Sequence, residues 1–283
     1  MTISIMPVRR DIRFKLNPSR ITNWHKSGTG VSQFLNTMSL FFPVGERFFI
    51  DSVRHYRDVA KDDPELKAAI TAFIGQEAMH GREHEEMNEL LNQAGCAANT
   101  QEKMVLNLLK LVQKITPKSF QLAATVSLEH LTAILGDMLL NNREHFFENA
   151  DEGYAKIWMW HALEETEHKA VAFDVFQKAM KDHPIYSYLL RVTSLPLATG
   201  IFFVLCYSFY VHNMARIGEG TNWKQWFTSF NYQWGKPGML RQTIRPWLDW
   251  FKPSFHPWDH DNRQFLELVD SVVGDLLEAD KAA

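Results

Sequence analysis

Apolar residues recur every three or four positions from about residue 31 onward, and few stretches alternate between polar and apolar residues. This period is typical of amphipathic helices, so the pattern predicts an all-α fold. Proline and glycine mark the expected helix ends. The predicted helices cover about residues 44–60, 65–95, 101–115, 118–147, 151–180 and 262–279.

Residues 192–211 contain no formally charged side chain and are long enough to span a bilayer. Pro196, Gly200 and several hydroxyl residues lower their hydrophobicity, so we expect a central buried helix, with a membrane span as the alternative. The aromatic-rich residues 213–283 are predicted to pack across the bundle as a C-terminal extension. We expect one domain over residues 1–283, with a bundle at about residues 40–182.

Composition narrows the function classes. Hydrophobic residues make up 46% of the 283 residues and charged residues 22%, as in globular proteins. Lys and Arg total 30 against 33 Asp and Glu, so no basic footprint for nucleic acid exists. Two cysteines support no disulfide framework, and the N-terminus lacks a secretory h-region. We therefore expect a cytoplasmic protein, with peripheral or integral membrane association left open.

Two of the predicted helices carry the same Glu-x-x-His motif. Glu77 and His80 share one helix face, as do Glu165 and His168, because residues three apart are neighbours on a helix. His161 lies one turn before Glu165 on the same stripe, where it is either a further metal ligand or a core histidine. One such motif alone is weak evidence, whereas two on predicted helices are stronger.

Two further helices each place a carboxylate on an apolar face. Glu46 shares its face with Phe49 and Val53, and Glu129 shares its face with Val126 and Ala133. A buried carboxylate is costly unless it is paired, neutralised or bound to metal. Each glutamate alone could be an ordinary ion-pair partner. One Glu from each of two helices and Glu-x-x-His from each of two others is, however, the ligand set of a ferritin-like di-metal four-helix bundle.

The candidate ligands favour particular metals. Oxygen and imidazole donors without thiolate suit two iron ions, with manganese or zinc as alternatives. His84 and His130 are expected to hydrogen-bond a ligand carboxylate or cap the site. Glu164 and Glu167 flank the ligand face and are either solvated or close to the site. The full predicted ligand set is Glu46, Glu77, His80, Glu129, His161, Glu165 and His168.

Several motifs carry a family resemblance. The stretches FPVGERFFIDSVR, FIGQEAMHGREH, WMWHALEETEHKAVAFDVF and FHPWDHDN resemble a bacterial family described as predicted metal-dependent hydrolases, over about residues 40–262. The spacing of His161, Glu165 and His168 is also similar to that of the p-aminobenzoate N-oxygenase group of di-iron enzymes. That resemblance implies that His161 binds one iron.

These patterns lead to one main functional hypothesis and two alternatives. The main hypothesis is a di-iron oxidoreductase that activates O₂ to oxidise a small apolar or aromatic substrate with an electron donor, using Glu46, Glu77, Glu129 and Glu165. The first alternative is a hydrolase whose two metals activate water. The second is iron storage, which the chain length beyond a four-helix bundle disfavours. Membrane association through residues 192–211 and a homodimer are further expectations.

Overall fold

Local chemistry explains where the long helices begin and end. In α3 (Pro64–Gln93), the Asp63 side chain accepts a hydrogen bond from the Leu66 backbone amide, and Pro64 occupies the first turn. Gly95 follows the helix with φ +96°, a conformation that glycine adopts without strain. Proline also lies in the first turn of α2 (Phe42–His55) and of α9 (Pro184–Arg216).

The computed structural model describes residues 5–281, and within them it is all-α, as predicted, with no β-strand. The predicted order of long helices is confirmed, whereas several boundaries differ. The remaining helices are α1 (Thr29–Ser39), α4 (Ala98–Ile115), α5 (Lys118–Asn141), α6 (Arg143–Phe146), α7 (Glu152–His168), α8 (Val171–Ala179), α10 (Trp223–Trp234), α11 (Met239–Asp249) and α12 (Val269–Lys281).

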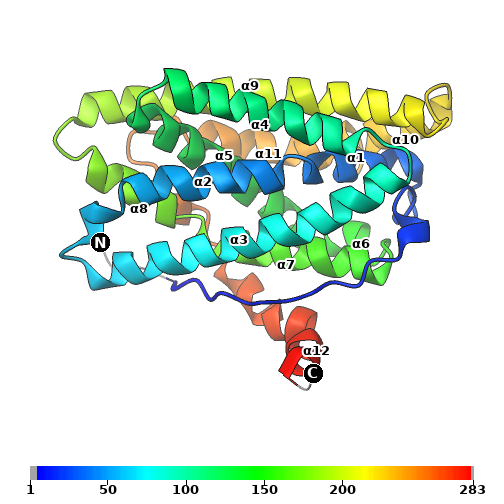
Figure 1. The fold of residues 1–283 in the computed structure, drawn as a ribbon, viewed down its shortest axis with the longest axis horizontal. Helices are drawn as coiled ribbons and strands as arrows, with labels where there is room; N and C mark the ends of the chain where they lie inside the picture. The colour runs from blue at the N-terminus through cyan, green and yellow to red at the C-terminus, as the bar shows by residue number, and fades with distance from the viewer. Residues whose placement is uncertain (1–4, 282–283) are drawn as a thin grey trace.

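Four helices form a closed ring of contacts at the centre of the fold. Helix α2 packs against α3 and α5, and α7 packs against the same two helices (Figure 1). The approach of α5 and α7 depends on Gly136, because a Cβ there would lie 3.3 Å from the Cα of Ala162. The four helices that carry the predicted glutamates are therefore the four that pack together.

Several boundaries correct the sequence prediction. The helix predicted at 44–60 ends at His55, and a separate 3₁₀ turn covers Arg57–Ala60. The helix predicted at 151–180 is two helices, α7 and α8, with a break directly after His168. The helix predicted at 262–279 begins as a 3₁₀ segment, and the aromatic-rich segment before it contains α10 and α11.

Helix α9 is not the central buried helix that we predicted for residues 192–211. It is longer, and it runs along the outside of the bundle (Figure 1). Two helices are long and apolar enough to cross a membrane by length and composition, namely α5 and α9. The most apolar part of α5 is 72% buried, as in a core helix, whereas that of α9 is only 22% buried. The prediction of a helix here is confirmed, whereas the prediction that this helix is buried at the centre is wrong.

An extended N-terminal segment runs along α3 and α7, on the opposite side of the bundle from α9 (Figure 1). The Phe14 amide donates to the Glu83 carboxylate of α3, and the Val8 amide donates to Glu167 of α7. Arg82 of α3 bonds back to Asp11 and to the Ile12 carbonyl. Residues 8–14 thus join the two helices that carry the Glu-x-x-His motifs, and we call them the N-terminal strap.

Candidate metal centre

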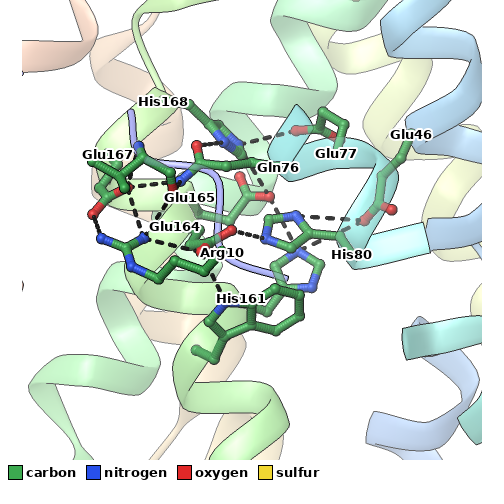
Figure 2. A network of polar contacts seen from close by, with 12 residues as sticks. Arg10, Glu46, Gln76, Glu77, His80, His161, Glu164, Glu165, Glu167 and His168 are labelled. Carbon is green, nitrogen blue, oxygen red and sulfur yellow. Dashed lines mark hydrogen bonds and ion pairs between the residues drawn. The ribbon is translucent and has the colours of Figure 1, made fainter. Parts of the chain in front are cut away.

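The structure brings all seven predicted ligands together inside the four-helix ring. They come from α2, α3, α5 and α7, and each residue is at most 4% exposed. Figure 2 shows the side chains of Glu46, Glu77, His80, His161, Glu165 and His168 gathered together. Each of three overlapping groups offers ligand atoms that lie within 4.8 Å of one another. These groups are Glu46, His80 and His161; Glu77, Glu129 and His168; and Glu77, His80 and Glu165.

Three carboxylates surround one face of His168. Its Nε2 atom lies 3.1 Å from Glu77 Oε1, 3.5 Å from Glu165 Oε1 and 3.6 Å from Glu129 Oε2. Two of these glutamates come from different helices than His168 itself. One ring nitrogen therefore lies close to three carboxylates, as it would if all four groups bound the same cation.

A second cluster forms around Glu46. Its Oε1 atom lies 3.8 Å from His161 Nε2 and 4.0 Å from His80 Nδ1. His161 Nε2 also lies 3.1 Å from Glu165 Oε1. Glu165 thus faces both clusters, and its other oxygen accepts a 2.6 Å hydrogen bond from the Thr132 hydroxyl. This position suits a carboxylate that bridges two cations.

The hydrogen bond on the far side of His168 determines which of its nitrogens is free. Gln76 donates its amide protons to Glu167 and to the Val8 carbonyl, so its oxygen is the atom that faces His168 Nδ1 at 3.0 Å. That oxygen only accepts, so Nδ1 of His168 carries the ring proton. Nε2 is then the nitrogen that faces the carboxylates and is positioned to bind a metal ion, as in metal-binding histidines.

A longer hydrogen-bonded chain gives His161 the same orientation. The Ser39 hydroxyl donates to Asn88 at 2.8 Å, so Ser39 accepts from Nδ1 of His84, also at 2.8 Å. Burial and the neighbouring His161 and His80 hold the pKa of His84 well below its ordinary value, so the ring is neutral. His84 Nε2 therefore accepts from His161 Nδ1 at 2.8 Å, so Nε2 is the nitrogen with which His161 faces Glu46 and Glu165.

A ring nitrogen that faces carboxylates needs a proton or a metal ion between them, and other atoms of the site favour a metal ion. Both oxygens of Glu46, Glu77 and Glu129 are buried without a hydrogen-bond donor, as is His168 Nε2. Buried polar atoms of this kind are costly unless something else satisfies them. The residues present therefore fit bound metal ions.

The glutamates also show the electrostatic cost of the site without metal. Burial, followed by repulsion from neighbouring glutamates, raises the pKa of Glu46, Glu77 and Glu129 well above the ordinary value. Burial also acts to raise the pKa of Glu165, but His168 and His161 outweigh it and lower the pKa. Only Glu165 is therefore held as a carboxylate by protein groups alone, whereas the other three would take up protons or bind cations.

The N-terminal strap supplies a charge that the sequence did not indicate. Arg10 pairs with Glu164 at 3.0 Å and with Glu167 at 2.6 Å (Figure 2). Glu164 is fully buried, and its Oε2 lies 3.2 Å from His80 Nε2. Burial raises the pKa of Glu164 to about 7, an effect that Arg10 partly offsets. Glu164 is therefore not solvated; it lies directly behind His80.

A glycine makes room for one of the carboxylates. A Cβ on Gly81 would lie 3.3 Å from Glu46 Oε2, closer than most side-chain contacts allow. Gly81 directly follows His80 on α3. The absence of a side chain at this position therefore lets Glu46 reach across from α2.

The prediction that His130 hydrogen-bonds a ligand carboxylate or caps the site is wrong. Its ring stacks on Trp250 at 4.6 Å between centroids, and its Nε2 lies 3.3 Å from the Pro246 carbonyl. It thus faces the C-terminal segment rather than the four glutamates. His84 does belong to the site, although it bonds His161 and not a carboxylate.

A cavity of about 200 Å³ extends from the metal centre toward α9. Glu46, His161 and Thr132 line its inner end, and Leu197 and Ile201 of α9 line its outer end. Most other residues around it are Phe, Leu, Met and Val, so its wall is almost entirely apolar. An apolar molecule could therefore reach the metal centre without meeting a hydrogen-bonding surface.

Comparisons with known proteins gave one match. A family model described as "Predicted metal-dependent hydrolase" matches residues 8–261. No curated protein and no solved structure matches the chain. The matched range begins at the N-terminal strap and includes all seven ligand candidates.

Proposed function

The chain belongs to the predicted metal-dependent hydrolase family, and we propose that its metal dependence reflects a two-metal centre that oxidises an apolar substrate with O₂. The seven clustered side chains are the observation that carries the proposal. Glu46, His80 and His161 would hold one ion, Glu77, Glu129 and His168 the other, and Glu165 would bridge them. Four carboxylates match the charge that two cations need, and the donor set suits iron.

Bound iron would supply electrons to O₂. The protein's own groups orient and isolate that chemistry. Gln76 and the chain from His84 to Ser39 hold ring protons away from the centre, and Thr132 fixes one oxygen of Glu165. The apolar cavity wall excludes water and accommodates a substrate that lacks polar groups.

The cavity favours oxidation over hydrolysis. Hydrolytic substrates carry a carbonyl or phosphoryl group and a polar leaving group, and sites that accept them offer hydrogen-bond donors. Thr132 and Ser194 are the hydroxyl residues in this wall. Both are already engaged, Thr132 with Glu165 and Ser194 with Ser127 and the Ala123 carbonyl.

Hydrolysis remains the second candidate because the family's description names it. Two metals can polarise an ester or phosphate and activate a water molecule. In this protein, Glu164 would be the candidate base, since it lies beside His80 and its pKa of about 7 is suited to proton transfer near neutral pH.

One experiment separates the two functions. The protein is loaded anaerobically with Fe²⁺, supplied with a chemical reductant and an alkylbenzene probe, and then exposed to O₂. Oxidation predicts that O₂ is consumed and a hydroxylated probe forms, with one oxygen atom entering the product and the other reduced to water by two electrons and two protons. Zinc-loaded protein that cleaves a chromogenic ester or phosphate, together with iron-loaded protein that consumes no O₂, would establish hydrolysis instead.

Matched variants show whether the reaction depends on the centre. Glu129→Gln keeps the side-chain shape and removes a ligand charge, so it should abolish O₂ consumption. Glu89→Gln changes an exposed glutamate of α3 and should leave the rate unchanged. Iron oxidation that proceeds equally with and without the probe, and without product, would indicate iron storage.

A further inference from the structure

Helix α9 exposes a continuous apolar stripe to solvent. Leu189, Leu197, Ile201, Val204 and Val211 are 41–71% exposed and recur at helical spacing along one side. No Asp, Glu, Lys or Arg is exposed on this helix before Arg216. The opposite side of α9 packs on the bundle, with Arg191, Ser194 and Asn213 buried there.

Neighbouring helices extend this stripe on both sides. Helix α10 exposes Trp223, Phe227 and Phe230, which are 76%, 66% and 63% exposed at spacings of four and three. Its Trp234 donates to the Tyr207 hydroxyl, which joins α10 to α9. Helix α4 exposes Leu111 and Ile115, and its first turns bond to the end of α9 through Gln101. We call the exposed apolar residues of α4, α9 and α10 the apolar face. Soluble monomers rarely expose so many large apolar side chains together.

The exposed charged residues of α4 and of residues 184–248 are mainly basic, although the chain has a formal charge of −3. On residues 184–248 the only acidic residue is Glu219. The exposed basic residues of the same range are Arg216, Lys224, Lys236, Arg241 and Arg245. On α4, Lys103, Lys110 and Lys114 are also exposed. Aromatic side chains next to lysine and arginine are typical of surfaces that enter the headgroup region of anionic membranes.

The cavity above the metal centre reaches the surface on this same face. Leu197 and Ile201, which line its outer end, are also 51% and 41% exposed members of the apolar stripe. Leu108 and Val112 of α4 line the cavity opposite them. A molecule that leaves a lipid layer between α4 and α9 would therefore enter the cavity without crossing water.

We infer that the apolar face docks on an anionic lipid bilayer, so that lipid-dissolved apolar molecules enter the cavity directly from the membrane. Helix α9 lies flat on the surface and does not span the bilayer. Spanning would expose Arg191, Ser194 and Asn213 to hydrocarbon and remove α9 from α5, against which it packs. Docking depends only on the surface, whereas delivery of a substrate rests on the proposed function.

A second copy of the chain is the competing occupant of this face. A two-fold interface would place the same patch of both copies together. The basic residues around the face would then meet their own equivalents, and like charges facing each other oppose association. An anionic lipid surface, in contrast, pairs with them. The charge around the face therefore favours lipid.

Vesicle sedimentation tests the inference with purified full-length protein. We expect binding to phosphatidylcholine vesicles that contain phosphatidylglycerol and much weaker binding to phosphatidylcholine alone. The variant Trp223→Ser, Phe227→Ser, Phe230→Ser should lower the partition coefficient about tenfold or more. Reversing Lys224, Arg241 and Arg245 to Glu should lower it similarly, and only on anionic vesicles. Val8→Ser alters a 51% exposed residue of the N-terminal strap and should bind like the wild type.

The outcomes are distinguishable from those of the oxidation experiment. Circular dichroism and bound-metal content first establish that each variant is folded. Binding to neither vesicle, or binding that survives both triple variants, overturns the inference even if iron-loaded protein consumes O₂. A solution dimer that the aromatic variant dissociates, with no vesicle binding, assigns the face to a second copy instead. Vesicle binding without O₂ consumption supports docking and rejects the oxidation chemistry.

Discussion

Replacing Glu129 with glutamine should have opposite effects on the stability of the metal-free and metal-loaded protein. Carboxylate oxygens of Glu77 and Glu129 lie within 4.8 Å of each other, and both residues are about 1% exposed. At an effective dielectric constant of about 20, two charges at that distance repel by about 3.5 kcal/mol. Protonating one of them at pH 7 instead, 2.5 units above the ordinary pKa of 4.5, costs about 3.4 kcal/mol.

Glu129→Gln removes this penalty because the amide is neutral. The metal-free variant should therefore be about 3 kcal/mol more stable than the metal-free wild type at pH 7. The difference follows pH with a definite sign. Because the pKa of Glu129 is raised in the folded state, folding takes up a proton above pH 4.5, and the wild type loses stability as pH rises from there. Below pH 4.5 the two proteins should converge.

Metal reverses the order. With Fe²⁺ or Zn²⁺ in excess, the wild type gains stability from binding, and the variant gains less because it has lost a charged ligand. The assay is urea unfolding followed by tryptophan fluorescence, with chelator or with metal, at several pH values. Glu89→Gln should change stability by less than about 0.5 kcal/mol in every condition. If Glu129→Gln destabilises the chelator-treated protein as much as the metal-loaded protein, the carboxylates do not form a cation site.

Three further predictions concern other parts of the chain. Gly81→Ala should force Glu46 away from its position and weaken metal binding, measured by metal titration, whereas urea stability in chelator should fall by less than about 1 kcal/mol. Arg10→Ala leaves Glu164 and Glu167 without their cation, so the midpoint of thermal unfolding should fall by the equivalent of about 3 kcal/mol. Arg10→Lys should recover part of the loss, and an unchanged midpoint in Arg10→Ala would show that this contact of the strap is dispensable. Burial holds the pKa of His25 at about 4, so its ring stays neutral in the folded state, whereas in the unfolded state it takes up a proton below pH 6.5. The free energy of unfolding should therefore fall by about 2 kcal/mol as the pH is lowered from 7.5 to 5, and a His25→Gln variant should lack that part of the fall.

Spacing along the chain was sufficient to predict which side chains meet, but not what lies behind them. Residues three apart share a helix face in any fold, so Glu77 with His80 and Glu165 with His168 could be paired from the sequence. Arg10 and Gln76 were missed. Arg10 lies in an extended segment without periodicity, and its partners are more than 150 residues away. Gln76 is an uncharged residue on a long helix, and only its hydrogen bond to His168 distinguishes it.

Histidine orientation and helix exposure escaped prediction for related reasons. His84 and His130 each follow an apolar helical pattern, and only the rotation of the helix in the bundle decides which one faces the glutamates. The apolar composition of α9 describes a core helix and a surface helix equally well. Its location was decided by the surface that α1 and α5 offer, which is a property of the assembled fold.

The wide separation of the seven ligand residues along the chain governs how the protein acquires its metals. No single helix supplies more than three of them, so a partly synthesised or unfolded chain would hold metal weakly. The ions must therefore enter after α7 has docked. Because every ligand is then at most 4% exposed, exchange requires the helices to separate locally. Loading of the folded protein, and removal of metal by a chelator, should therefore be limited by the rate of this local opening.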